Sequence, residues 1–390
     1  MNVKSNIWKI YAIQALRWFM LSMPIFALFF LENGLSMSQI LLLQAFFSLV
    51  IVLVEIPSGY WSDLFGRKNA IVIGCVLNFV GISIYALSHG FFGFLFAELA
   101  LGIGAGFISG ADSALLYDSL LNLDNPDEYK KYEGKKNFFE SGSEGIASII
   151  GGFLAVISLR TPFYAQAVLV FFSIPIALSL VEPARSTLNN IEGNFKTLWR
   201  VVKFSLHEHA EVKWLIIYSS LISASGIGVV WFIQPFLAQV GLPLALFGIA
   251  WAILQFATAV TAFYAHRIES FFGKTASLVS LTFLTLTGYM LVAKFGAIWI
   301  IPAFLIFYFV RGINTPVLKD YVNRLISSDI RATVLSIKNL IARLIFAIVG
   351  PFVGWAADAY SIQTAFFLSG ILFFLSGLVA VGFLRKYKVI

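Results

Sequence analysis

The segment Gly59-Tyr-Trp-Ser-Asp63-Leu-Phe-Gly66-Arg67-Lys68 separates two apolar runs, near residues 38–60 and 69–88. Each run has the length of about 20 residues that a helix needs to cross the hydrocarbon core of a bilayer. The polar segment between them is short, and its glycines suit a sharp reversal of the chain. It therefore predicts two neighbouring membrane helices joined by a tight basic loop.

The same length criterion, applied to the whole chain, predicts an all-α integral membrane protein with twelve transmembrane helices. The 390 residues are 59% hydrophobic and only 12% charged, whereas soluble domains carry about 25% charged residues. The runs are continuously apolar and lack the alternation of a membrane β-barrel. The expected spans lie near residues 8–31, 38–60, 69–88, 93–121, 138–158, 163–181, 213–239, 244–265, 274–294, 297–322, 332–357 and 362–384.

The distribution of lysine and arginine predicts the orientation of these spans. The net charge of +7 is spread over short loops, so no basic face is broad enough for a nucleic acid. With twelve spans, nearly all loop cations fall on one side, and the opposite loops hold only Arg160 and Lys294. Because positive loops stay in the cytoplasm, we expect a multi-pass protein of the plasma (inner) membrane with both termini cytoplasmic.

The chain is expected to form two six-helix bundles, residues 1–185 and 213–390, joined by a cytoplasmic linker over residues 186–212. Phe195, Leu198, Trp199, Val202 and Leu206 have helical spacing in the linker, which predicts an amphipathic surface helix. The loop that ends the second span has a counterpart, Tyr264 to Lys274, at the end of the eighth. Such parallel repeats are typical of transporters with a binding site between the two halves.

The loop motif Gly59-x3-Asp63-x2-Gly66-Arg67-Lys68 resembles the signature loop of the major facilitator superfamily, except that Leu64 replaces a common basic residue. The resemblance covers the whole chain and implies a secondary transporter that works by alternating access. It also implies that this loop latches the two halves, with Asp63 and Arg67 facing the start of span eleven near Arg331 and Ala332.

Two further motifs resemble a bacterial branch of the family that contains drug and metabolite exporters. They are Glu55-Ile-Pro57-Ser-Gly59 and Ser109-Gly110-Ala-Asp112 with Tyr117-Asp118. Export is favoured over import, although the proline that exporters place in span five is missing. The sequence contains neither a nucleotide-binding Gly-x4-Gly-Lys-Ser/Thr motif nor a His-Glu-x-x-His motif, so an enzyme is not expected. A membrane scaffold or channel is the alternative outside transport.

Charged side chains inside the predicted spans are functional candidates, because such charges are costly in lipid and usually face a cavity. Arg17 and Asp112 each lie about 13 Å from the cytoplasmic end of their spans. The resemblance implies that spans one and four are neighbours that line a cavity, so we expect these two residues to pair. The pair either neutralises two buried charges or lets Asp112 exchange its proton during transport. Glu55, Glu98 and Glu144 form a possible proton path, or are interfacial structural carboxylates.

The C-terminal half carries Arg311 and Arg343 deep in spans ten and eleven, with no carboxylate at their depth in that half. Arginine suits bidentate binding of a carboxylate or phosphate. An organic anion, such as a carboxylate metabolite or carboxylate siderophore, is therefore the alternative substrate to a drug. Structural pairing with an acid of the N-terminal half is the competing interpretation.

Polar and aromatic side chains near these charges are weaker substrate-binding candidates: Gln14, Trp18, Trp231 and Gln234. Such residues also serve helix packing and contact lipid. We expect no metal and no cofactor. The expected partners are the lipid bilayer, a small-molecule substrate and protons, and short loops make a monomer the default state.

Overall fold

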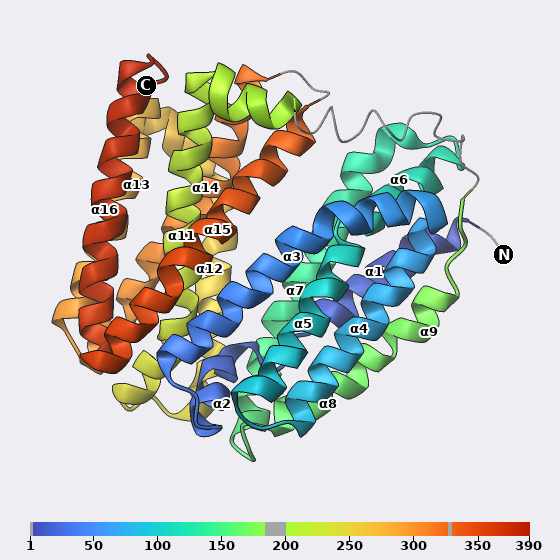
Figure 1. The fold of residues 1–390 in the computed structure, drawn as a ribbon, viewed down its shortest axis with the longest axis horizontal. Coiled ribbons are helices and arrows are strands. Elements are labelled where there is room, and N and C mark those ends of the chain that lie inside the picture. Colours follow the sequence, from blue (N-terminus) through green and yellow to red (C-terminus); the bar gives the residue numbers. More distant parts are fainter. Residues whose placement is uncertain (1–2, 184–199, 327–329) are drawn as a thin grey trace. The chain divides into compact units, whose positions relative to one another are not determined.

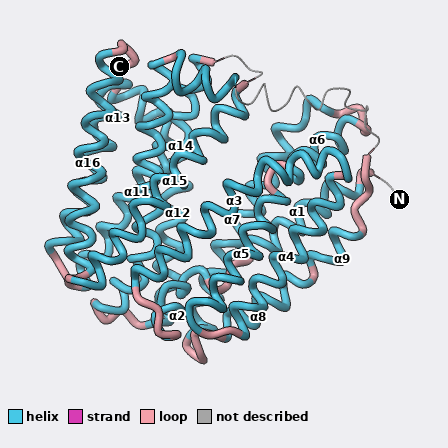
Figure 2. Tube along the Cα trace, in the orientation of Figure 1, coloured by secondary structure: helices cyan, strands magenta, loops and turns pink. Residues whose placement is uncertain are grey.

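The computed structural model describes residues 3–183, 200–326 and 330–390, and all their regular elements are helices (Figures 1 and 2). The first half contains α1 (Ser5–Trp18), η1 (Met23–Ile25), α2 (Phe26–Glu32), α3 (Met37–Phe65), α4 (Arg67–Leu87), α5 (Gly90–Ile108), α6 (Ala111–Leu121), η2 (Pro126–Glu128), α7 (Tyr129–Ala155), α8 (Thr161–Phe171) and α9 (Ser173–Leu178). The second contains η3 (Phe204–Glu208), α11 (Ala210–Gln239), η4 (Leu244–Leu246), α12 (Phe247–Phe272), α13 (Lys274–Lys294), η5 (Ile298–Ala303), α14 (Phe304–Leu325), α15 (Arg331–Ala359) and α16 (Ile362–Lys386).

The predicted fold class is confirmed. Eleven helical segments of the described residues are long and apolar enough to cross a membrane. Each coincides with a predicted span. The remaining predicted span, near residues 138–158, lies in α7, whose 27 residues are long enough but include four charged side chains after residue 134 (Lys135, Lys136, Glu140 and Glu144).

The chain divides into two compact units. The first comprises Met1–Leu35, Phe46–Thr187 and Pro243–Ala252, and the second comprises Ser36–Ala45, Leu188–Leu242 and Ile253–Ile390. Each unit thus includes the start of one helix from the other half of the sequence, which the predicted boundaries omit. In the second unit, the carboxylate of Asp358 accepts hydrogen bonds from the amides of Met37 (2.8 Å) and Ser38 (2.7 Å) and so caps the start of α3.

Within the first unit, α4 and α5 approach closely through two glycines. A Cβ atom on Gly74 would lie 2.8 Å from the carbonyl oxygen of Gly104, and one on Gly104 would lie 3.0 Å from the carbonyl oxygen of Gly74. In lipid, helix association relies on such close contacts because no hydrophobic effect drives it. The glycines of span four therefore serve helix packing.

Substituting Gly104 with valine tests this contact. We expect the variant to lose thermal stability by several degrees in detergent, because α4 and α5 must move apart to accommodate the added methyl groups. Gly145→Ala is the matched control, since a Cβ at that helical glycine meets no atom within 4 Å. Equal melting temperatures for Gly104→Val and the wild type would contradict the interpretation.

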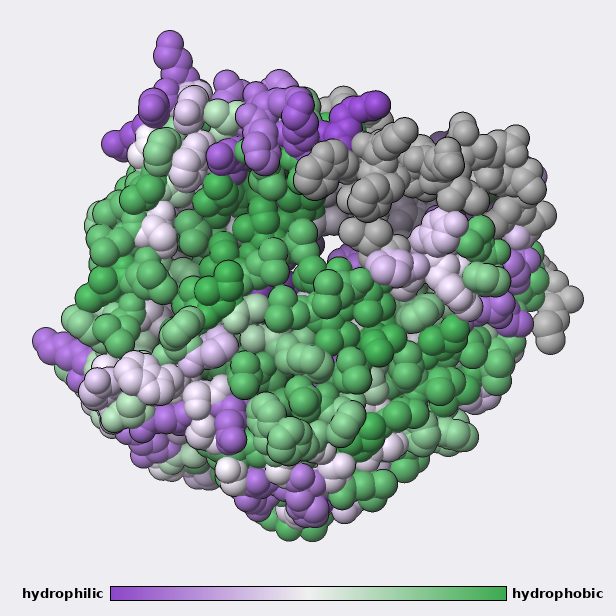
Figure 3. Space-filling model, viewed as in Figure 1, coloured by the Kyte–Doolittle hydropathy of each residue, from purple (hydrophilic) through white to green (hydrophobic). Residues whose placement is uncertain are grey.

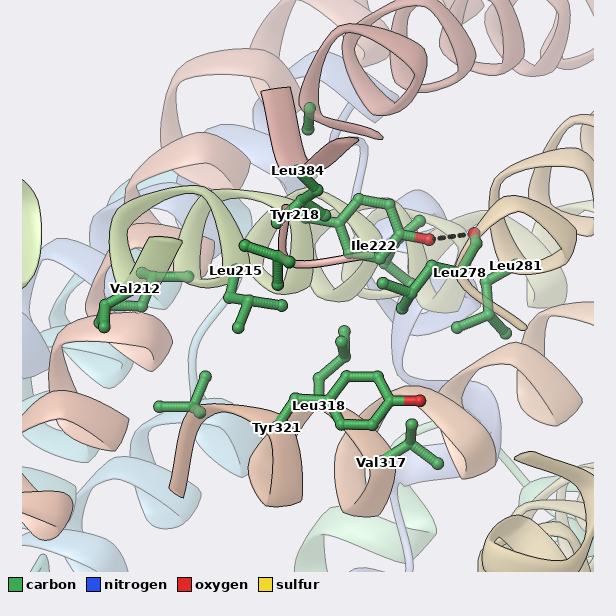
Figure 4. Packing of buried hydrophobic residues seen from close by; sticks show 14 of the residues in the cluster. Val212, Leu215, Tyr218, Ile222, Leu278, Leu281, Val317, Leu318, Tyr321 and Leu384 are labelled. Carbon is green, nitrogen blue, oxygen red and sulfur yellow. Dashed lines mark hydrogen bonds between the residues drawn. The ribbon is translucent and has the colours of Figure 1, made fainter. Parts of the chain in front are cut away.

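The core of the second unit surrounds α11 (Figure 4). Leu215, Tyr218 and Ile222 of α11 face Leu278 of α13 and Leu318 of α14, and all are at least 96% buried. The Tyr218 hydroxyl satisfies its donor by binding the carbonyl oxygen of Leu278. Most of the predicted linker helix lies outside the described residues, but at its end residues 200–203 are helical and Val201 is buried in the same core cluster.

Hydrophobic side chains cover the sides of the helices, and hydrophilic ones gather near the helix ends (Figure 3). This is the pattern expected of helices whose outer faces contact lipid. Helix α16 shows it clearly, because seven large apolar residues are exposed along it: Phe367, Leu368, Ile371, Leu372, Leu375, Leu378 and Val379.

Two spans of the first unit are not continuous helices. In span one, α1 ends at Trp18 and regular structure resumes at Met23. In span four, α5 ends at Ile108 and α6 begins at Ala111, with Gly110 between them at φ +80°. A non-glycine residue adopts such a backbone conformation only at a cost. Discontinuous helices within a membrane leave polar backbone groups that are tolerated only against other protein or a cavity.

Candidate functional site

The breaks in spans one and four bring a polar cluster together inside the first unit. Asp112 lies in the first turn of α6, directly after the break, and is 9% exposed. Arg17 lies in the last turn of α1, directly before the other break. A helix N-terminus stabilises a carboxylate and a helix C-terminus stabilises a cation, so each charge occupies the favourable end of its helix.

The predicted direct pair between Arg17 and Asp112 is wrong in detail, because Gln14 lies between them. The side-chain amide of Gln14 donates to the Asp112 carboxylate, and its oxygen accepts a hydrogen bond of 3.0 Å from Arg17. Gln14 is 2% exposed. The contacts around Asp112 thus link both charges through one buried amide rather than through an ion pair.

The cation that pairs with Asp112 is Lys136 of α7. Its ammonium lies 3.0 Å from Asp112, 2.7 Å from Glu133 and 2.7 Å from the hydroxyl of Ser113. The carboxylates of Asp112 and Glu133 are opposite charges that favour the protonated form of Lys136.

Lys136 and Glu133 are the residues of this cluster that the sequence did not single out. The charge asymmetry places Lys136 in a cytoplasmic loop, whereas the structure places it in α7 with a side chain only 6% exposed. The four-residue spacing between charges in this segment is compatible with a helix. No pattern in the sequence, however, shows that α7 turns this lysine toward α6.

The signature loop is held by contacts within the first unit. The carboxylate of Glu182 accepts hydrogen bonds from the backbone amides of Arg67 (3.0 Å) and Lys68 (2.8 Å), and so caps the start of α4. Gly66 adopts φ +107° beneath this cap. Arg67 forms an ion pair with Asp118 at the end of α6 and donates to the carbonyl oxygen of Ala114 at 2.6 Å.

The latch role of this loop stays a prediction. Asp63 and Arg331 belong to different units, and the contact expected between them would join these units. Gly59, at the start of the motif, lies within α3, and a Cβ there would meet no atom within 4 Å.

The three candidate acids of the proton path lie on three different helices. Glu55 of α3 accepts a hydrogen bond of 3.3 Å from Ser109, at the break of span four. Glu98 of α5 is 2% exposed and lies beside Tyr85. Glu144 of α7 accepts a hydrogen bond of 3.4 Å from the indole of Trp251.

The other candidates differ in exposure. Trp231 and Gln234 of α11 are buried, at 8% and 1% exposure. Trp18 is 38% exposed at the end of α1. Arg311 of α14 is exposed and Arg343 of α15 is partly buried, and both belong to the second unit.

Comparison with known proteins identifies the family. The family model described as Major Facilitator Superfamily matches residues 8–351. The chain belongs to the Major Facilitator Superfamily. This confirms the resemblance that the signature loop and the twelve spans predict, and it makes the protein a multi-pass membrane transporter by family.

Two curated transporters resemble parts of the chain. The quinolone resistance protein NorA of Staphylococcus aureus is 26% identical over 174 residues, which are 44% of this chain and 44% of that protein. An uncharacterized transporter of Buchnera aphidicola is 30% identical over 155 residues, 37% of this chain and 35% of that protein. The chain thus matches less than half the length of these curated relatives.

Solved superfamily structures resemble the chain over its whole length. The nucleoside transporter NupG has a TM-score of 0.77 at 14% identity, covering 100% of this chain and 99% of that one. A bacterial homologue of the human lysosomal transporter Spinster has a TM-score of 0.76 at 16% identity, covering 99% and 97%. A POT family transporter has a TM-score of 0.73 at 14% identity, covering 99% and 96%. Identities this low show the fold alone.

The ion pair between Asp112 and Lys136 can be tested through stability. We expect Lys136→Gln to lower the free energy of unfolding by about 3 kcal/mol, because it leaves two carboxylates facing each other without their cation. Adding Asp112→Asn should restore part of the loss. Thermal unfolding of the purified single and double variants measures both effects, and a double variant less stable than Lys136→Gln would contradict the pairing.

A second stability test concerns the signature loop. Gly66→Ala should cost at least about 1 kcal/mol, because alanine is strained at positive φ and its Cβ would lie 3.2 Å from the Glu182 carboxylate. Gly273→Ala is the matched control, since Gly273 has φ +78° but no atom within 4 Å of its Cβ position. The melting temperature should fall further for Gly66→Ala than for Gly273→Ala; the reverse order would rule out the contact.

Proposed function

We propose that the chain is a proton-coupled secondary transporter that exports a small organic molecule, a drug or a metabolite, by alternating access. The observation that carries this proposal is the buried cluster of Asp112, Lys136, Glu133 and Gln14 beside the breaks of spans one and four. A titratable carboxylate that is buried at this depth is a functional candidate by default. The helix breaks at the same place support the interpretation that spans one and four change conformation there.

The chemistry of the cluster suits proton exchange at Asp112. In its ionised form, Asp112 accepts hydrogen bonds from Gln14 and from the ammonium of Lys136. Protonation removes the charge that holds Lys136 against α6. A proton can therefore change the contact between α6 and α7 directly, which is what coupling of proton and substrate movement requires.

Glu133 makes this protonation possible at low cost. A buried cation that loses its only counterion is strongly unfavourable. Lys136 keeps an ion pair with Glu133 at 2.7 Å when Asp112 becomes neutral, and the Glu133 side chain is 25% exposed and thus better solvated. Lys136 would then shift toward Glu133 and away from α6, so that one protonation moves one side chain between two partners.

The partial similarity to a quinolone resistance protein supports export of drug-like molecules. Solved neighbours include nucleoside and peptide transporters, so the fold by itself is compatible with other cargo. The charge asymmetry supports a location in the plasma (inner) membrane with cytoplasmic termini. A monomer is the expected state, and the substrate and protons are the expected partners.

Proton coupling predicts a specific defect for Asp112→Asn. We expect the variant to lose transport driven by a pH gradient, because an amide cannot exchange a proton, while substrate counterflow continues in proteoliposomes. Asp320→Asn is the control, since Asp320 is exposed and pairs with Arg324 at the end of α14. A thermal-shift screen of drugs, sugars, carboxylates and siderophores, at two pH values, first identifies the compound that is labelled for these assays.

Three results bear on the proposal. Full gradient-driven transport by Asp112→Asn would refute coupling at this residue. Loss of both modes in Asp112→Asn, with normal folding, would assign Asp112 to substrate binding instead. The absence of counterflow in the wild type with every compound that binds would favour a scaffold or channel.

A further inference from the structure

Helix α14 presents a polar face where a lipid-contacting helix would present an apolar one. All residues of α14 are described, and six of them are exposed: Arg311, Thr315, Lys319, Asp320, Arg324 and Leu325. Only Leu325, the last residue, is apolar. The spacing of Arg311, Thr315 and Lys319 by four residues places them in one stripe along the helix.

The remaining faces of α14 are packed within the second unit. A Cβ on Gly312 would lie 2.7 Å from the side chain of Thr261 in α12, and Asn314 donates a hydrogen bond of 3.0 Å to Ser223 of α11. Val317 and Leu318 contact the core cluster around α11 (Figure 4). The polar stripe is thus the one side of α14 that the second unit leaves uncovered.

Lipid is not a suitable neighbour for this stripe. Arg311 lies about 13 residues, or about 20 Å, from both ends of the segment Ile298–Leu325, and so in the middle of a span. A cation in contact with hydrocarbon at that depth is expensive. Helix α16 of the same unit exposes leucine, isoleucine and phenylalanine instead. Water or a polar ligand is therefore a more favourable neighbour for the stripe on α14 than lipid.

A buried cation lies next to the stripe. Lys338 of α15 is 8% exposed, and Lys319 is close enough to repel it electrostatically. Both lysines lie within about 9 Å of the same end of their spans, because α14 ends and α15 begins there. Among the described residues of the second unit, no carboxylate lies within ion-pair distance of Arg311, Lys319 or Lys338.

We propose that Arg311, Lys319 and Lys338 bind the anionic group of the transported molecule, a carboxylate or a phosphate. The proposal rests on the transport function above and specifies its substrate as an organic anion. The two lysines repel each other, and one of them is largely removed from water. An anion bound between the two lysines would reduce their repulsion and would compensate the buried charge. Because these charges are already held in place, little conformational entropy is lost on binding.

The arrangement also gives the anion a direction of travel. The lysine pair lies near one end of the spans, and Arg311 lies about 12 Å further along α14. The guanidinium of Arg311 can bind both oxygens of a carboxylate or phosphate in one plane. An anion can therefore be attracted at the lysines and be held at the middle of the membrane, where alternating access requires the substrate to bind.

Anion binding to the full-length protein in phosphatidylcholine nanodiscs tests the proposal without any pH gradient. The thermal midpoint is titrated with citrate and with inorganic phosphate at constant ionic strength, with chloride as the reference salt. We expect a saturable rise for the wild type. In Arg311→Gln and Lys338→Gln, the concentration that gives half of the rise should increase about tenfold or more.

Each variant serves as its own reference, so a change in its unliganded stability does not obscure the result. Arg324→Gln is the matched control on α14, because Arg324 is exposed and pairs with Asp320, and it should respond like the wild type. No saturable rise in the wild type with either anion, or an unchanged response in both variants, would overturn the proposal.

A further arm separates a soluble anion from a lipid headgroup. If phosphatidylglycerol in the nanodisc stabilises the wild type but not the variants, while citrate and phosphate have no effect, the site binds lipid and the substrate assignment is wrong. Asp112→Asn should keep the response to citrate. Failure of proton coupling at Asp112 would therefore leave the anion result unchanged, and the two proposals fail separately.

Discussion

The structure depends on one constraint: a charge inside a membrane span must be compensated by the protein itself. In the first unit, Lys136 meets this constraint for Asp112, and Glu133 provides a second partner for Lys136. The ends of α1 and α6 add the favourable field of a helix terminus at Arg17 and Asp112. Three helices are thereby held together by polar contacts that lipid cannot replace.

In the second unit, the protein does not compensate every charge inside a span in this way. Its core around Tyr218 and Leu318 is apolar, but Arg311, Lys319 and Lys338 have no carboxylate within ion-pair distance among the described residues of that unit. In our account the two units divide the work of transport: the first handles the proton and the second handles the substrate. The energetic reason is that fixed, paired charges suit proton exchange, whereas unpaired ones suit binding of an anion.

Sequence alone was sufficient for the fold. Length and hydropathy placed eleven of the spans on helices of sufficient length and apolarity, because backbone polar groups in lipid leave only helices as a solution. The signature loop identified the family, although Gly59 to Phe65 lie within α3 and Arg67 and Lys68 begin α4 rather than lying in a loop. Sequence also showed which charges are deep, since depth follows from counting residues along a helix.

The partners of those charges could not be predicted in the same way. Counting residues along the helices predicts that Arg17 and Asp112 lie at one depth. The rotation of α7 and the breaks after Trp18 and Ile108, however, pair Asp112 with Lys136 and place Gln14 between Arg17 and Asp112. Likewise, the exposure of Lys319 and the burial of Lys338 depend on how α14 and α15 pack. Such rotations arise from many small contacts and have no short motif.

The central claim is that Asp112 is the group that gains and loses the coupled proton. Infrared difference spectra of the purified protein, recorded between acidic and neutral buffer, test it most directly because they need no substrate. Our account predicts a carbonyl band of a protonated carboxylic acid that is present in the wild type and absent in Asp112→Asn. Identical difference spectra for the two proteins would contradict it.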